Sequence, residues 1–217
     1  MIKYPKIHGL YKRDSNGRFM IGEYSKLEFG HLEETLWTWT EKIDGQNIRI
    51  GMDKEGKILF HGRSDNAELN FNLVDELEQL FYPKMTELLD VFGGYDDWTI
   101  FGEGVGAKIN KSGDYFGDYG FVAFDIWADG LWFDRDAVDS ISGYLGLHYT
   151  PTIFKGTIGQ AVDFVSAGMQ RSQFHEPERT PRLAEGLVGT PSVGLLDRWG
   201  SRIITKVKRR DFTNAGT

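Results

Sequence analysis

The segment Glu41-Lys42-Ile43-Asp44-Gly45-Gln46-Asn47 contains a lysine whose surroundings fit covalent catalysis. An apolar and aromatic run at residues 36–40 precedes it and predicts a strand. The amine of Lys42 would then lie at a strand end, beside a carboxylate and a flexible turn. An amine whose pKa is lowered by its neighbours can attack phosphorus or carbonyl carbon and form a covalent intermediate. The segment also fits an ordinary hairpin, because Asp-Gly is a strong turn signal.

The residue types available for a metal site favour oxygen ligands. The chain has no cysteine, and its five histidines are scattered without the spacing of zinc ligands. Any divalent ion would therefore be held by carboxylates, which points to magnesium or manganese.

Composition is typical of a soluble globular protein, with 40% hydrophobic and 26% charged residues. At 217 residues the chain fits one large domain, so we expect a single domain over residues 1–217 and a monomer. No apolar stretch is long enough to span a bilayer, and the N-terminus lacks the apolar core of a signal peptide. Together with the absence of cysteine, this predicts a cytoplasmic protein, or a virus-encoded one that acts in the host cytoplasm.

The distribution of charge is uneven. A formal net charge of −7 argues against bulk attraction to nucleic acid. Residues 198–210, however, contain six cations and no acid, namely Arg198, Arg202, Lys206, Lys208, Arg209 and Arg210. This stretch could hold a polyanion locally, or it could be a solubilising tail.

The elements that would position these residues are mainly strands. Patterning predicts strands at 36–43, 46–52, 57–61, 98–101, 121–127, 186–188 and 202–207. Helices are predicted at 71–91, with Pro83 weakening its middle, from about Asp134 onward, and at 157–168. Because hairpins outnumber crossover units, we expect an α+β fold with mostly antiparallel sheets and flanking helices.

A glycine-rich segment, Gly102-Glu103-Gly104-Val105-Gly106-Ala107, has the outline of a dinucleotide-binding fingerprint. Such a fingerprint needs a helix whose N-terminus faces the pyrophosphate. Residues 108–120 contain three glycines and no helical apolar period. The segment therefore predicts a carboxylate fixed at a strand end, not a Rossmann site.

Six motifs in order make the lysine segment specific: Lys42-x-Asp44-Gly45, Arg63 in His-Gly-Arg-Ser, Glu103 between two glycines, Phe121 opening Phe-Val-Ala-Phe-Asp-Ile, Glu185-Gly186-Leu187-Val188, and Lys206-Val207-Lys208. They resemble the nucleotidyltransferase motifs of covalent polynucleotide ligases and capping enzymes. The similarity is greatest to ATP-dependent RNA ligases of the phage RNA ligase 2 type. It spans residues 41–208, and the order of the six motifs is more specific than any one of them.

The resemblance implies a role for each residue. Lys42 would be the nucleophile, with Lys206 and Lys208 on the phosphates and lowering the pKa of Lys42 by repulsion. Glu41, Asn47, Arg63, Glu103 and Phe121 would contact the nucleotide or the RNA end, with Phe121 stacked on the base. Asp44, Glu103 and Glu185 would hold hydrated Mg²⁺ or Mn²⁺.

Simpler structural explanations exist for three of these residues. Phe121 and Phe124 fall on opposite faces of a strand, so one ring could belong to the core; we favour Phe121 as the ring that meets the base. Glu185-Gly186 could be a plain turn. Glu41 could protect the edge of a strand.

The family resemblance implies an ATP-dependent RNA ligase with an adenylation-domain fold and the nucleotide between its sheets. Its partners would be RNA 5′-phosphate and 3′-hydroxyl ends, with no membrane. The alternatives are a DNA ligase of the same chemistry and a non-catalytic nucleotide or nucleic-acid binding module. Only a short tail follows Lys208, so we expect no C-terminal OB-type domain.

Overall fold

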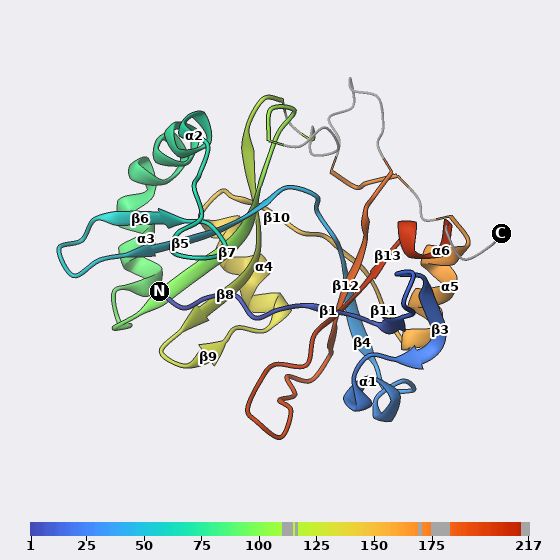
Figure 1. Ribbon diagram of the computed structural model, residues 1–217. Coiled ribbons are helices and arrows are strands. Elements are labelled where there is room, and N and C mark those ends of the chain that lie inside the picture. The colour runs from blue at the N-terminus through green and yellow to red at the C-terminus, as the bar shows by residue number, and fades with distance from the viewer. Residues whose placement is uncertain (110–114, 116, 169–170, 175–182, 214–217) are drawn as a thin grey trace. The chain divides into compact units, whose positions relative to one another are not determined.

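The computed structural model describes residues 1–109, 115, 117–168, 171–174 and 183–213. The chain forms two compact units, drawn in Figure 1. Unit 1 comprises residues 1–4 and 44–150, and unit 2 comprises residues 5–43 and 151–217. One of the passages from unit to unit lies between Ile43 and Asp44, inside the lysine motif.

Unit 1 is built on a six-stranded sheet with the order β10-β8-β7-β5-β6 and with β9 paired to β8. Every pairing in it is antiparallel except the short one between β10 and β8. Its elements are β5 (Gln46–Met52), β6 (Ile58–His61), α2 (Phe71–Phe81), the 3₁₀ turn η1 (Tyr82–Lys84), α3 (Met85–Phe92), β7 (Trp98–Val105), β8 (Gly120–Ala128), β9 (Leu131–Trp132), α4 (Arg135–Tyr144) and β10 (His148–Tyr149).

The helices of unit 1 cover one face of this sheet. Leu73, Leu77 and Phe81 recur every four residues along α2 and are fully buried. They pack with Ile48 and Ile50 of β5 in a cluster that also takes residues from α3, α4, β7 and β8. The alternate residues of β5 therefore lie on the face that this cluster leaves uncovered.

The predicted helix over 71–91 is interrupted at Pro83. The structure has α2 up to Phe81, then η1, then α3 from Met85. Proline has no backbone N–H to donate, and its ring clashes with the preceding turn of an α-helix. The chain tightens into a 3₁₀ turn at this point and continues as a second helix.

Unit 2 contains a five-stranded sheet with the order β1-β13-β12-β4-β11 and a separate hairpin of β2 and β3. A buried cluster that includes Trp37, Trp39, Leu187 and Val207 joins this sheet to α5 and to the hairpin. Its elements are β1 (His8–Gly9), β2 (Tyr11–Arg13), β3 (Phe19–Tyr24), α1 (Leu27–His31), β4 (Trp37–Glu41), β11 (Thr152–Gly156), α5 (Ile158–Ser166), β12 (Gly186–Pro191), β13 (Thr205–Lys208) and α6 (Arg210–Thr213).

The predicted α+β class with mostly antiparallel sheets is confirmed. Strand β7 continues to Val105, and no helix occurs among the described residues between β7 and β8, which argues against a dinucleotide-binding turn. The strand predicted over 202–207 is shorter and later, at Thr205–Lys208. Among the described residues, no helix is both long enough and apolar enough to cross a bilayer.

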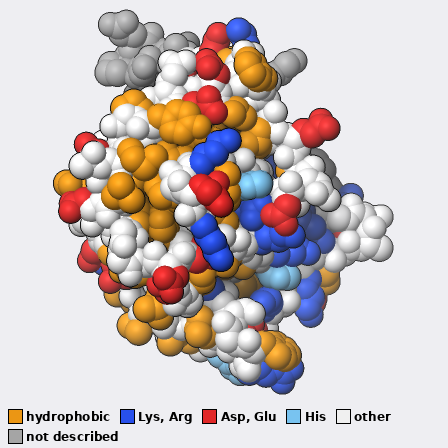
Figure 2. Space-filling model, turned by 90° about the vertical axis from the view of Figure 1, so that its left-hand side faces the viewer, with side chains coloured by type: hydrophobic (Ala, Val, Ile, Leu, Met, Phe, Trp, Pro, Cys, Tyr) orange, Lys and Arg blue, Asp and Glu red, His pale blue; other side chains and the backbone are white. Residues whose placement is uncertain are grey.

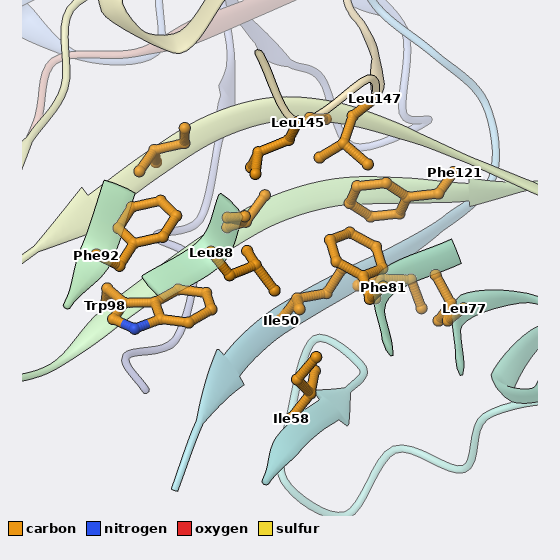
Figure 3. Packing of buried hydrophobic residues seen from close by; sticks show 14 of the residues in the cluster. Ile50, Ile58, Leu77, Phe81, Leu88, Phe92, Trp98, Phe121, Leu145 and Leu147 are labelled. Carbon is orange, nitrogen blue, oxygen red and sulfur yellow. The ribbon is translucent and has the colours of Figure 1, made fainter. Parts of the chain in front are cut away.

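The packing of Phe81 in unit 1 leads to a stability prediction. Figure 3 shows its ring in the cluster with Phe121, Leu77 and Ile50, and the rings of Phe81 and Phe121 meet edge to face at 5.5 Å. Phe81→Ala should lower the free energy of unfolding by about 3–5 kcal/mol, because it leaves a cavity. Phe71→Ala, on the same helix but 81% exposed, should change it by less than about 0.5 kcal/mol. Urea unfolding of both variants tests this, and equal losses would contradict the packing described.

Candidate active site

Lys42 directly follows β4 in unit 2 and is held by the neighbouring strand. Its backbone N–H donates to the carbonyl of Gly186 at 2.9 Å, one residue beyond the β4–β12 ladder. The side chain is 18% exposed. The hydrogen-bonded ladder thus fixes the backbone of Lys42 next to the start of β12, where Glu185 stands.

Glu185 forms ion pairs with two lysines. Its Oε2 lies 2.5 Å from Nζ of Lys42, and its Oε1 accepts a hydrogen bond from Nζ of Lys208. All three side chains are largely buried, at 14–18% exposure. The sequence led us to expect only repulsion between Lys42 and Lys208. The structure places the carboxylate of Glu185 between their two ammonium groups, and the sequence alone did not reveal this contact.

The electrostatics of Glu185 follow from this position. Burial disfavours the charged carboxylate, but the ammonium groups of Lys42 and Lys208 outweigh burial and hold the pKa of Glu185 below its usual range. The carboxylate is therefore anionic at neutral pH. The alternative that Glu185-Gly186 is only a turn does not account for the ion pairs of Glu185 with Lys42 and Lys208.

Lys206 and Lys208 share one face of β13. The residue between them, Val207, is fully buried in the cluster of unit 2, so the two lysines point to the opposite face. Lys206 pairs with Val188 in the ladder, and Val188 pairs with Thr40 of β4. The structure therefore brings Lys42, Lys208 and Glu185 into contact and puts Lys206 on the same face as Lys208.

Glu41 is on the other face of β4, with Trp39 of the buried cluster. It is 1% exposed. Its Oε2 accepts the backbone N–H of Gln173 at 2.8 Å, and its Oε1 accepts the hydroxyl of Ser172. Glu41 thus fixes the described segment 171–174 against β4, the strand that Lys42 follows. Ser172 is a residue that sequence reasoning missed.

Asn47 and Glu103 lie side by side in unit 1. They are paired in the β5–β7 ladder, and Glu103 is paired with Val122 of β8. This row is on the face of the sheet away from the helices, because Ile48 points into the helical cluster. The Oδ1 atom of Asn47 is buried and accepts no hydrogen bond within the described part of the chain, which suits a group that recognises a ligand.

The glycines on either side of Glu103 have a packing reason. A Cβ at Gly102 would lie 2.1 Å from the ring of Phe121, and one at Gly104 would lie 2.8 Å from Leu73. The core side chains thus rest directly on the backbone of β7, and only the opposite face of this segment of the strand can carry a side chain. Glu103 occupies that face.

Asp44 and Gly45 lie close to Glu103. A Cβ at Gly45 would be 2.9 Å from Cγ of Glu103 and 2.3 Å from the carbonyl oxygen of Gly104, and the backbone N–H of Asp44 donates to the hydroxyl of Tyr115 at 3.1 Å. Gly45, the residue after Asp44, therefore lies against the side chain of Glu103 in unit 1. The third expected metal ligand, Glu185, belongs to unit 2, and no group of three metal-binding side chains occurs among the described residues.

Phe121 does not lie where a base could stack on it. Its ring is 2% exposed and buried in the helical cluster against Phe81 (Figure 3). A bulge in the β7–β8 ladder leaves Phe124 as an extra residue, because Phe101 pairs with Asp125 while Gly102 pairs with Ala123. Phe124 is half-buried and packs against Tyr4 at 5.0 Å. Phe121 is therefore a core residue here, the opposite of the assignment favoured from the sequence.

Arg63 is exposed on the loop after β6, and a buried arginine holds that loop. Arg49, 1% exposed, donates through Nε to the carbonyl of Gly62 at 2.8 Å and pairs with Asp65 at 2.8 Å. Its two contacts bracket Arg63. Arg49 was missed from the sequence, although it alternates with Ile48 and Ile50 on the face of Asn47.

The sequence model described as RNA ligase matches residues 35–208. The chain belongs to the RNA ligase family. The match covers every residue assigned above, from Glu41 to Lys208. A comparison with curated proteins gave no match.

Solved RNA ligases share the fold. An archaeal ATP-dependent RNA ligase has a TM-score of 0.64 at 18% identity, over 98% of this chain and 49% of that one. A Naegleria gruberi RNA ligase variant with ATP and Mn has a TM-score of 0.62 at 16% identity, over 96% of this chain and 64% of that one. A second variant with AMP and Mn has a TM-score of 0.59 at 16% identity, over 83% and 52%. The chain thus spans about half to two thirds of the length of these ligases.

The ion pairs of Glu185 predict a pH-dependent stability. Because the pKa of Glu185 is lower in the folded protein than in the unfolded chain, its charge stabilises the fold at neutral pH, and this is lost as the pH falls through the folded pKa. Glu185→Gln should therefore lower the free energy of unfolding by about 1–3 kcal/mol at pH 7 and by much less below about pH 4.

Urea unfolding of wild type and variant at several pH values measures this difference. Glu23→Gln is the matched control, because Glu23 pairs with Lys12 at 3.6 Å on an exposed surface and should matter by less than about 1 kcal/mol. A difference for Glu185→Gln that stays constant down to pH 3 would contradict the assignment of the effect to the carboxylate charge.

Proposed function

We propose that this chain is the catalytic part of an ATP-dependent RNA ligase that joins 5′-phosphate and 3′-hydroxyl ends through a lysyl-AMP intermediate. The observation that carries the proposal is the placement of Lys42 in a chain of the RNA ligase family: a largely buried lysine at a strand end, paired with a carboxylate that a second lysine also contacts. Enzymes that use lysine as a nucleophile need a sheltered, charge-tuned amine of this kind.

In the first step Nζ of Lys42 attacks the α-phosphorus of ATP. A P–N bond forms, the bond from the α-phosphorus to the bridging oxygen breaks, and pyrophosphate leaves. Nζ must give up a proton and its ion pair with Glu185 to do this. Lys208, on the other oxygen of Glu185, and Lys206, on the same face of β13, are the cations of unit 2 that would stabilise the negative charge on the phosphates.

Two transfers would follow. AMP passes from Lys42 to an RNA 5′-phosphate, which gives a 5′-5′ pyrophosphate linkage and frees the amine. A 3′-hydroxyl then attacks the 5′-phosphorus, the phosphodiester bond forms and AMP leaves. The electrons balance without an oxidant or reductant, and the energy of both steps comes from the pyrophosphate linkage of ATP.

The carboxylates fit a divalent ion by their chemistry. Asp44 and Glu103 both belong to unit 1, and carboxylate oxygens are the ligands that Mg²⁺ and Mn²⁺ prefer. These two residues would hold the ion in unit 1. When bound, such an ion neutralises charge on the phosphates. The Mn²⁺ in the Naegleria structures supports this assignment.

Unit 1 would supply recognition of the nucleotide and the RNA end. Asn47 offers a buried Oδ1 that needs a donor, and Arg63 is held in place by the contacts of Arg49 on both sides of it. Because the family match runs through both units, we propose that they form one adenylation domain.

The charge distribution is compatible with a polyanionic substrate. Figure 2 shows several Lys and Arg side chains close together on part of the visible face, with Asp and Glu side chains beside them and elsewhere. An acidic protein can bind RNA locally through such a gathering of cations.

Covalent capture of AMP tests the first step. Wild type incubated with α-phosphate-labelled ATP and Mg²⁺ should retain label after denaturation, and Lys42→Ala should retain none. Lys12→Ala, which removes an exposed lysine of unit 2, should be labelled like wild type. A folded wild-type chain that takes no label from ATP, GTP or NAD would refute the ligase proposal and favour a binding module.

The choice between RNA and DNA needs a separate measurement. Sealing of a 5′-phosphate end should be compared for matched strands whose last nucleotides at the 3′-hydroxyl end are ribose or deoxyribose. We expect the ribose ends to be sealed at least about tenfold faster, because a site that bonds a hydroxyl rejects an analogue lacking it. Equal or faster sealing of deoxyribose ends would assign the chain to DNA.

A further inference from the structure

The connection between β12 and β13, residues 192–204, is a structured hairpin in unit 2. Figure 1 shows it extending beyond the end of the two strands. Leu196 and Arg202 are bridged, and the backbone N–H of Ile203 donates to Leu195 at 3.2 Å. Hydrogen bonds within the hairpin therefore fix its backbone conformation.

Asp197 holds the tip of the hairpin. One of its carboxylate oxygens accepts the backbone N–H groups of Trp199 and Ser201 at 2.9 and 2.8 Å, and its backbone N–H donates to the carbonyl of Ser201 at 2.7 Å. Gly200 has a φ of +76°, which allows the tight return of the chain. The positions of residues 198 and 199 are thus set before any ligand arrives.

This tip displays an aromatic ring and a cation together. Trp199 is 68% exposed, and the guanidinium carbon of Arg198 lies 3.9 Å from the centre of its ring. A cation over one face of an indole is attracted by the ring and holds its plane. A largely exposed tryptophan buries little apolar surface in the fold, so its contribution to stability is small. The indole ring of Trp199 is thus held by Arg198 and is accessible to solvent. A flat ring in this position can stack on a base.

The charge around the hairpin is positive. Its one acid, Asp197, has a side chain that is 4% exposed and engaged in the turn, and Nζ of Lys26 lies 3.9 Å from it. Burial and the charges of Lys26, Lys6 and Lys206 lower the pKa of His8 on β1, the edge strand of the same sheet. Lys26 thus adds a cation beside the hairpin, whose own cations are Arg198 and Arg202.

We propose that the β12–β13 hairpin is a binding platform for single-stranded RNA, with one base stacked on Trp199 and a neighbouring phosphate paired with Arg198. This rests on the proposed function, which makes RNA the substrate. Aromatic rings combined with cations along a strand are how proteins hold single strands without reading their sequence. The platform would hold RNA outside the residues that join the ends.

Charge favours RNA over a protein as the occupant. Val193 and Leu196 are exposed at 72% and 60% and could also meet an apolar protein surface. Such a partner would have to cover Arg198 and leave its charge unpaired, which is costly. RNA instead supplies both a flat apolar base and an anion next to it.

Binding is measured with a fluorescent single-stranded RNA about 12 nucleotides long that has a 5′-hydroxyl, so it cannot be adenylylated. Trp199→Ala should weaken binding by about 5- to 100-fold, and Trp199→Phe by less than about threefold, because it keeps a ring. Phe71→Ala, which removes an exposed ring of unit 1, is the matched control and should bind like wild type.

The salt dependence separates the two contacts. Arg198→Met keeps an apolar stem over the indole but removes the charge, so the slope of log affinity against log salt should decrease by about 0.7. Trp199→Ala should weaken binding while leaving that slope unchanged. This pattern distinguishes a stacking residue from a phosphate contact and from general unfolding.

If Trp199→Ala binds the RNA with the affinity of wild type, the platform proposal is wrong. It is also wrong if Phe71→Ala loses as much RNA affinity as Trp199→Ala. If Trp199→Ala instead changes only the association state of the chain, the hairpin is a protein contact and the proposal is wrong. Labelling of Lys42 by ATP is followed in every variant, because it needs no RNA. Labelled protein with unaltered RNA binding refutes the platform alone, whereas absence of labelling refutes the proposed function.

Discussion

The shared carboxylate of Glu185 is the interaction on which the proposed chemistry depends. Two ammonium groups and one carboxylate, all largely buried, leave a net positive charge at the end of β4. This charge would attract an incoming polyphosphate. The resting ion pairs therefore both protect the amine and position it, and their rearrangement is the event that would start the reaction.

In each sheet, one face packs into a buried cluster, and the other face carries residues that we assign to the site. In unit 1 the helical cluster takes Ile48, Leu73 and Phe121, and in unit 2 the other cluster takes Trp39 and Val207. Asn47, Glu103, Lys206 and Lys208 are on the opposite faces of these strands. Glu41 is the exception, because it lies with Trp39 and fixes the segment around Ser172. The period of two along a strand makes this division possible.

The sequence predicted the strands around Lys42, a weak point of the helix at Pro83 and the proximity of Lys208 to Lys42, because turn signals, proline and ordered motifs act locally or by type. It could not place Phe121, since the bulge after Phe101 changes which residues share a face. It missed Arg49, whose partners become neighbours only after the β5–β6 hairpin forms. Strand β1 was also missed: two residues carry no periodic signal.

Gly102 and Gly104 have an evolutionary consequence. Because core side chains rest on the backbone of β7 at these positions, neither can gain a Cβ without moving the core. Glu103 between them has no such restriction, since its side chain points the other way. Selection for folding and selection for substrate therefore act on alternate residues of one strand, so new specificities could arise at position 103 without a loss of core packing.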